Sequence, residues 1–208
     1  MRRRVIAYDS SKPSIVWTDS GYDAPAVGKK VWTFASKAIG TALATRSVFV
    51  ATDITLTTMT IGGVSAVKIV QGGTLSIWVA PVPTGSTATI ILTTPGTPGY
   101  GIRIQVWAAY ALLSLTAHAT KSVSLGASAG AIDVSVNTPD LGVVVAASAN
   151  YRSDPAATWS GLMTDNNMNT GLDTISAASI SDTVSATPRS ISVSWPATAN
   201  DAVSASFR

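Results

Sequence analysis

The side chains best suited to catalysis are few in this chain of 208 residues. His118 is the only histidine, and the residues on either side of it, Leu115–Thr120, include no acid. All eleven acidic residues are aspartates, scattered among turn-like segments where aspartate commonly turns or caps the backbone. A hydrolase that uses histidine or paired aspartates is therefore a remote alternative, and we expect a protein that is not an enzyme.

One oxygen-rich segment, Asp165–Asp173, is a candidate for cation binding. Asp165, Asn167 and Asn169 alternate as oxygen ligands do at the start of a calcium loop. The pattern then departs, because Gly171 comes one position late and no glutamate follows as a bidentate ligand. The chain also has no cysteine, which excludes disulfides and thiolate zinc sites. We favour a turn-rich surface segment here and expect no metal and no cofactor.

Aromatic side chains are the best candidates for surface recognition. Trp78 and Trp107 are expected on the strand face opposite to the one that carries most aliphatic residues of their segments. Trp159 follows Tyr151 in an irregular stretch. Exposed aromatic rings can stack on sugar rings or anchor protein interfaces. These four side chains are therefore the candidate outer contacts, either with a glycan or with a partner protein, although a second sheet layer would explain them as well.

The positive charge is concentrated at the start of the chain. The formal net charge is +3, and Arg2, Arg3 and Arg4 are consecutive. No basic stripe spaced by aromatic residues accompanies them, so we expect no specific nucleic-acid binding. The favoured interpretation is a basic tip that docks on a partner protein.

Alternating apolar residues organise the middle of the chain. In Thr74–Tyr110, three apolar runs are separated by turn clusters, which predicts three β-strands. Gly62-Gly63 between apolar runs predicts a tight hairpin, and a second hairpin is expected around Gly126–Gly130. The continuous apolar run Leu141–Ala149 predicts a central strand buried on both sides. These signals recur every 8–12 residues, about the spacing of all-β proteins.

The fold class expected from these signals is all-β: an antiparallel, jelly-roll-like β-sandwich with an extended N-terminal arm. We assign residues 1–30 to the arm and residues 31–208 to one sandwich domain with an irregular loop at 150–171. The first apolar run is too short for a signal peptide, and no apolar stretch is long enough to span a membrane. Charged residues make up only 12% of the chain, which suits a surface covered by neighbouring subunits.

Three segments carry a resemblance to a known group of proteins. They are a TIGG-V-A hairpin at residues 58–67, an S-W-A-P-TG-ATI strand pair at residues 75–90, and a V-W-A-Y strand at residues 106–110. Over about residues 46–149, the chain resembles β-sandwich virion proteins of tailed bacteriophages and prophages. The resemblance implies a structural subunit of the capsid-decoration, head-fibre or tail-associated type, and it includes no catalytic motif.

We therefore expect a non-enzymatic virion structural protein that acts by protein–protein assembly. Its partners would be other capsid or tail subunits and further copies of itself in a symmetric, homo-oligomeric array. It would assemble in the cytoplasm of the bacterial host and reside in the virion. The alternative is a carbohydrate-binding β-sandwich module of a fibre or adhesin that binds a host-surface glycan.

Overall fold

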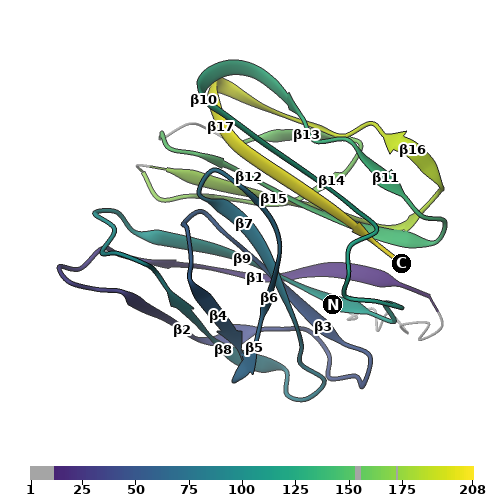
Figure 1. Ribbon diagram of the computed structural model, residues 1–208, viewed down its shortest axis with the longest axis horizontal. Coiled ribbons are helices and arrows are strands. Elements are labelled where there is room, and N and C mark those ends of the chain that lie inside the picture. The colour runs from purple at the N-terminus through teal and green to yellow at the C-terminus, as the bar shows by residue number, and fades with distance from the viewer. Residues whose placement is uncertain (1–11, 153–155, 172) are drawn as a thin grey trace, which may run out of the picture.

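The computed structural model describes residues 12–152, 156–171 and 173–208. Every regular element in these ranges is a β-strand, and every strand pair is antiparallel. The chain folds into sheets that stack face to face (Figure 1). The expectation of an all-β, antiparallel sandwich is confirmed, and the finer jelly-roll-like topology stays a prediction.

The first half of the chain forms two sheets, which lie in the lower part of Figure 1. The inner sheet has the order β1 (Ser14–Asp23), β9 (Ile102–Tyr110), β3 (Ser47–Thr52), β7 (Leu75–Pro81) and β6 (Val67–Gly72). The outer sheet has the order β2 (Val31–Ala38), β8 (Thr87–Thr93), β4 (Thr58–Ile61) and β5 (Val64–Ser65). Gly62 and Gly63 both have positive φ between β4 and β5, as the predicted tight hairpin requires.

The second half forms a third sheet and a small cap, which lie in the upper part of Figure 1. The third sheet has the order β10 (Ala119–Asp133), β17 (Ser192–Phe207), β12 (Gly142–Asn150), β15 (Thr174–Thr183) and β14 (Met163–Asn169). Strand β13 (Thr158–Ser160) also pairs with β17. The cap is the two-stranded sheet in which β11 (Val136–Thr138) pairs with β16 (Ala186–Arg189). The predicted central strand is β12, which is buried along its whole length between β15 and β17.

Three apolar cores fill the stack, and the middle one joins the two halves. The outer and inner sheets of the first half enclose one core, which includes Trp32 and Ile90. The opposite face of the inner sheet packs against the third sheet, where Phe49 meets Phe207 edge-on with ring centroids 5.0 Å apart. A third core lies beneath the cap and includes Trp195. The inner sheet is therefore covered on both faces, as the complete burial of β9 illustrates.

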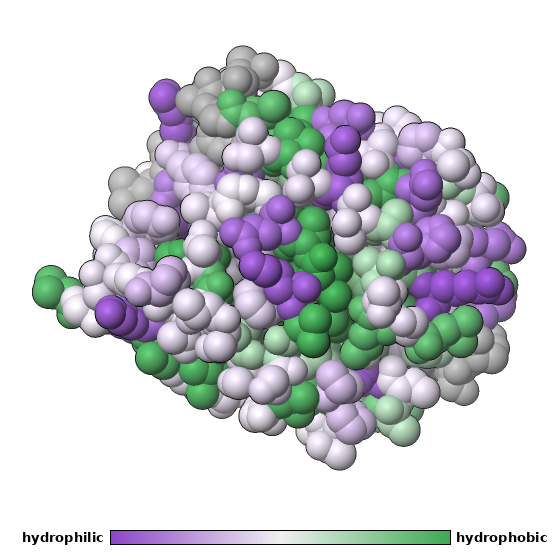
Figure 2. Space-filling view, in the orientation of Figure 1, coloured by the Kyte–Doolittle hydropathy of each residue, from purple (hydrophilic) through white to green (hydrophobic). Residues whose placement is uncertain are grey.

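The exposed face of the outer sheet carries no charged side chain within its described strands. Across four strands, Thr33 pairs with Ile91, Ile91 with Thr60, and Thr60 with Ser65. We call this surface the threonine face and define it by the outward residues Val31, Thr33, Ala35, Thr58, Thr60, Ser65, Thr87, Thr89, Ile91 and Thr93. Figure 2, in the orientation of Figure 1, shows strongly hydrophilic residues in a few separate groups on the visible side of the molecule.

The boundary expected for the arm differs from the structure. Ser14–Asp23, within the range 1–30, forms β1 and pairs with β9 along the edge of the inner sheet. Gly21 lies within this strand, and a Cβ atom there would come within 2.7 Å of Phe34 Cδ1. The glycine marks close packing of the strand and is not a chain break.

Two further boundaries also differ. The stretch 150–171 is not one irregular loop, because β13 and β14 lie within it. Strand β14 presents polar side chains to the inner sheet, so its sequence has no apolar alternation that would predict a strand. The hairpin expected around Gly126–Gly130 is wrong. One continuous strand, β10, runs through that segment and pairs with β17, with register shifts on either side of Ser128. Within the described ranges, no helix is long and apolar enough to cross a membrane.

Candidate functional site

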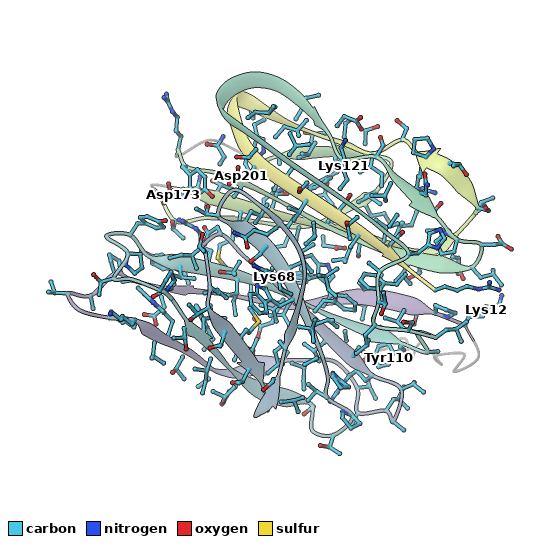
Figure 3. All side chains as sticks on the ribbon, in the orientation of Figure 1. Lys12, Lys68, Tyr110, Lys121, Asp173 and Asp201 are labelled. Atoms are coloured by element: carbon cyan, nitrogen blue, oxygen red, sulfur yellow. The ribbon has the colours of Figure 1, made fainter. Side chains whose placement is uncertain are left out.

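Loops from both halves gather at one end of the stack, at the left of Figure 1. The first half contributes the β3–β4 and β8–β9 connections, and the second half contributes the residues after β12 and before β15. We call this region the loop end. Asp173 and Asp201 both lie there, whereas Lys12, the first described residue, lies at the opposite end of the long axis (Figure 3). The ends of β-sandwiches are where connecting loops commonly carry recognition sites.

A buried ion network holds the loop end together. Arg103 and Asp53 are each 1% exposed, and they form a salt bridge through Arg103 Nε and Asp53 Oδ2. The backbone N–H of Arg103 also donates to Asp53 Oδ1 at 3.1 Å. Arg103 Nη1 then donates to Asp173 Oδ2 and to Thr170 Oγ1, each at 3.0 Å. One guanidinium from the first half thus fixes the turn that precedes β15 in the second half.

Burial opposes the attraction between the charges in this network: it raises the pKa of Asp53 above its ordinary value, although Arg103 acts to lower it. Burial alone would lower the pKa of Arg103, but Asp53 and Asp173 raise it above its ordinary value. Arg103 is therefore a permanent cation inside the protein. Its Nη2 atom is buried and has no hydrogen-bond partner among the residues that the structure describes. A buried donor without an acceptor is costly, so this atom marks a place where the network is incomplete.

A second polar cluster lies beside the network. The Tyr151 hydroxyl donates to Asp201 Oδ2 at 3.0 Å and contacts the hydroxyl of Thr74. The backbone N–H of Thr74 donates to the same Asp201 oxygen at 3.2 Å. Burial raises the pKa of Tyr151 well above its ordinary value, and the charge on Asp201 adds to that effect. The phenol therefore stays protonated and remains a hydrogen-bond donor.

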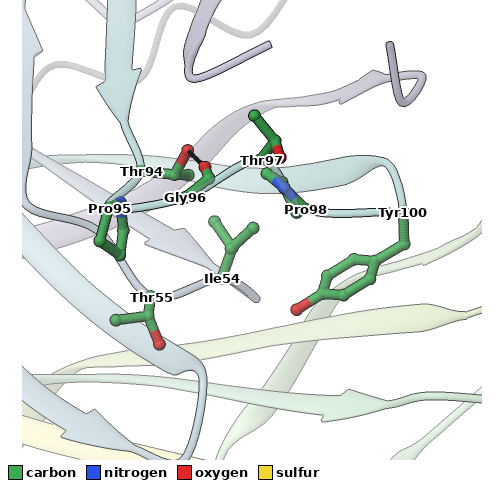
Figure 4. Close-up of a pocket in the computed structure, with 8 residues that line it drawn as sticks. All are labelled: Ile54, Thr55, Thr94, Pro95, Gly96, Thr97, Pro98 and Tyr100. Carbon is green, nitrogen blue, oxygen red and sulfur yellow. Dashed lines mark hydrogen bonds between the residues drawn. The ribbon is translucent and has the colours of Figure 1, made fainter. Parts of the chain in front are cut away.

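Tyr100 stands between two hollows of the loop end. On one side is a pocket of about 220 Å³ formed by the β3–β4 and β8–β9 connections (Figure 4). Figure 4 shows the Thr94–Pro98 segment along one wall, Ile54 and Thr55 along the other, and the Tyr100 ring closing the end. On the other side, Tyr100 shares a pocket of about 250 Å³ with Thr74, Tyr151 and Asp173.

The structure places the predicted outer tryptophans inside the protein. Trp78, Trp107 and Trp159 are buried, and their indole N–H groups donate to Ser76 Oγ, Asp165 Oδ2 and Ser176 Oγ, respectively. The expectation that these rings lie on an outer surface is wrong. Trp78 and Trp107 do stand opposite their aliphatic neighbours, but sheets cover both faces of the inner sheet. Trp159 packs under the cap.

Of the four predicted aromatic contacts, Tyr151 is the one that lines a pocket described here, and it is partly buried there. Arg2, Arg3 and Arg4 lie outside the described residues, and their docking role stays a prediction. His118 is exposed, and its imidazole forms no hydrogen bond or ion pair with the described part of the chain.

The oxygen-rich segment Asp165–Asp173 uses its side chains within the protein. Asp165 accepts from Trp107, Asn166 donates to Gln105, and Asn167 accepts from the backbone of Ala157. These contacts tie β14 to the inner sheet and to the residues before β13. Among the described residues, no group of three or more histidine, cysteine or acidic side chains is placed to hold a metal ion.

Sequence reasoning missed Arg103, Asp53 and Tyr100, which build the loop end. One signal was present: Arg103 is a single charge between Ile102 and Ile104 in a strand with almost no other polar residue. A charge in a buried strand requires a partner, so Arg103 predicts an ion pair without identifying the acid. Tyr100 lies in a Gly- and Pro-rich turn cluster, where no pattern distinguishes a recognition residue from a turn residue.

Comparison with known proteins adds no family to this description. No protein-family model matches the chain, and no match to it is found among curated proteins.

Proposed function

We propose that this chain is a non-enzymatic structural protein of a tailed-bacteriophage virion, of the capsid-decoration, head-fibre or tail-associated type. It acts by assembling with other capsid or tail subunits and with further copies of itself, first in the bacterial cytoplasm and then in the particle. The resemblance of residues 46–149 to such proteins motivates the proposal.

The threonine face is the observation that carries the proposal. Its outward residues include six threonines, Ile91 and Val31, and none of them is charged. Covering such a surface requires no desolvation of a charge, and Thr methyl groups and Ile91 supply apolar contact area. The face is therefore well suited to burial against another subunit.

The opposed ends of the molecule support an arrangement on a particle. Lys12 and the loop end lie at opposite ends of the long axis. A basic segment that docks near Lys12 would leave the loop end pointing away from the docking surface. Arg2, Arg3 and Arg4 are the proposed docking residues.

Particle incorporation tests the assembly function. The full chain and two variants, a deletion of residues 1–12 and Ile91→Lys, would be produced during infection, and purified particles would be examined by mass spectrometry and electron microscopy. We expect the full chain in many symmetric copies and each variant reduced at least tenfold. Thr164→Lys, at an exposed position on β14, is the matched control and should be incorporated normally. Absence of the full chain from particles would refute the proposal.

The second candidate function is carbohydrate binding by a fibre or adhesin, and the tyrosine-lined pocket at the loop end favours it. Two tyrosines, a threonine and an aspartate are a common chemical set for sugars, because aromatic rings contact C–H groups while hydroxyls and carboxylates bond the sugar hydroxyls. A glycan array probed with the full chain tests this function directly. Reproducible binding to host-surface glycans would support the carbohydrate-binding function, and an array without any binding would refute it.

A further inference from the structure

The pocket shared by Thr74, Tyr100, Tyr151 and Asp173 is built by both halves of the chain. Thr74 and Tyr100 come from the first half, and Tyr151 and Asp173 come from the second. Its volume of about 250 Å³ is below the range of 300–1,000 Å³ that is typical of drug-sized ligands. A pocket of this size fits one small ring and not an extended chain.

The polar walls of this pocket are fixed before any ligand arrives. Asp173 is held by Arg103, and Tyr151 is held by Asp201 together with Thr74. Arg103 is in turn locked by the buried Asp53. Side chains that are already ordered lose little conformational entropy on binding, so their contacts contribute more fully to affinity.

The charge of the surroundings selects against anions. The two hydrogen-bonded clusters contain three carboxylates and one guanidinium. The carboxylates are those of Asp53, Asp173 and Asp201, and the guanidinium is that of Arg103. Arg152 follows Tyr151 but is exposed and lies outside these clusters. A carboxylate or phosphate on a ligand would meet an excess of negative charge, whereas neutral hydroxyl groups can donate to Asp173 without this repulsion.

The two tyrosines supply the apolar ring faces and a hydrogen-bond donor that a sugar ring requires. Tyr100 is 40% exposed and therefore accessible, and burial raises its pKa above the ordinary value for tyrosine, so its phenol remains a donor. Aromatic rings offer apolar faces for C–H groups, and the Tyr100 hydroxyl offers a donor beside them, because the proton of Tyr151 is already donated to Asp201. Two aromatic rings, the Tyr100 hydroxyl as a donor and the Asp173 carboxylate as an acceptor thus line a space of single-ring size.

We propose that this pocket binds one neutral pyranose ring, such as the terminal residue of a host-surface glycan, through Tyr100, Tyr151, Thr74 and Asp173. This inference rests on the second candidate function and assigns it a site. It replaces the tryptophans expected from the sequence with a different set of residues.

The test uses the intact chain and a panel of methyl glycosides of neutral hexoses and N-acetylhexosamines, with methyl glucuronide as the anionic arm. Saturation-transfer NMR detects binding, and calorimetric or NMR titration gives the affinity. We expect at least one neutral glycoside to bind with a Kd of about 1 mM, as is reasonable for a ligand with few heavy atoms. Methyl glucuronide should bind at least tenfold more weakly.

Variants then assign the binding to this pocket. Tyr100→Ala and Asp173→Asn should each weaken binding at least tenfold, while Tyr100→Phe, which keeps the ring, should weaken it less. One control should bind as the unchanged chain does: Thr97→Ala alters the neighbouring pocket and leaves the four residues of this one in place. Thermal melting of each variant identifies loss of fold, and the exposed loop position of Tyr100 makes Tyr100→Ala the deciding variant.

The possible failures separate the site from the function. If the glycan array shows binding but Tyr100→Ala leaves it unchanged, the site is wrong and the carbohydrate function stands. If no neutral glycoside binds and the array is silent, both the site and the carbohydrate function are wrong. Tighter binding of the glucuronide than of every neutral glycoside would also overturn the proposal, because it contradicts the charge argument.

Discussion

Arg103 places a full charge in the interior of a protein that has few charges. Its partner Asp53 is equally buried, and Asp173 shares the same guanidinium. Removing one member of a buried pair leaves the other charge uncompensated, which is far more destabilising than replacing both. The network therefore fixes the geometry of the loop end more than it adds to the overall free energy of folding.

Arg103→Met is expected to lower the free energy of unfolding by about 3–5 kcal/mol, because the charge of Asp53 would remain buried without a counter-ion. The double variant Arg103→Met with Asp53→Asn should lose less than the single variant, since the fully buried charge is then removed and only Asp173, whose side chain is 15% exposed, lacks its counter-ion. Urea denaturation of both variants measures the difference. Lys68→Met, at an exposed lysine, is the control and should stay within about 0.5 kcal/mol of the unchanged chain. A double variant as unstable as Arg103→Met would contradict the argument.

Asp165 is expected to make stability depend on pH. Burial raises its pKa above the ordinary value, against the opposing hydrogen bonds from Trp107 and Ser179. A carboxyl with a raised pKa in the folded state is protonated more readily there than in the unfolded chain. Its stabilising contribution is complete below the ordinary aspartate pKa and is lost as pH rises through the raised folded pKa.

Asp165→Asn removes this titration while keeping an oxygen that can accept from Trp107. We therefore expect the variant to melt at a higher temperature than the unchanged chain at pH 7, with a smaller difference or none at pH 3. Melting curves across this range measure the effect. Asp140→Asn, at an exposed position, is the control. A lower melting temperature for Asp165→Asn at pH 7 would show that the charge of Asp165 stabilises the fold.

The tryptophans illustrate where residue-level prediction reached its limit. The alternation correctly separated Trp78 and Trp107 from the aliphatic face of their strands, but it could not show that a second sheet covers that face. Exposure depends on how sheets stack, which the sequence of one strand does not encode. The same limit hid the pairing of Arg103 with Asp53, fifty positions apart in the chain.

At the scale of the element, alternation succeeded where one face of a strand is apolar. The predicted strands of Thr74–Tyr110 are observed as β7, β8 and β9, although the chain crosses between two sheets along the way. Strand β14 was missed because its side chains reach the inner sheet through polar contacts. Strand β10 was divided in two because the glycines that mark its bulged region resemble those of a turn.

Gly21→Ala tests whether β1 belongs to the packed sandwich. The added methyl group would lie 2.7 Å from Phe34 Cδ1 and 3.2 Å from Ile104 Cγ1, so the strand must shift. Overpacking of this kind costs about 1–3 kcal/mol in the free energy of unfolding. Gly96→Ala is the matched control, because a methyl group there meets nothing within 4 Å. Equal stability of the two variants in chemical denaturation would place β1 outside the cooperative core.

At the scale of the whole molecule, the middle core makes the two halves depend on each other. The inner sheet has one face in each of two cores, and the third sheet provides the opposite wall of the second. Neither half could separate without exposing Phe49, Phe207 and the apolar side chains around them. The sequence predicted one sandwich domain over residues 31–208, and this shared core provides a physical reason for the halves to unfold together.

Phe207→Ala should therefore destabilise both halves, although Phe207 lies at the C-terminal end of the second. Truncating a buried phenylalanine costs about 3–5 kcal/mol. In hydrogen exchange measured by mass spectrometry under increasing denaturant, peptides covering β8 in the first half and β15 in the second should lose protection together, and both should do so earlier in the variant. Leu113→Ala, which is 76% exposed, is the control and should change neither. If β8 keeps its protection after β15 has exchanged, the two halves are independent domains and the middle core is an interface between them.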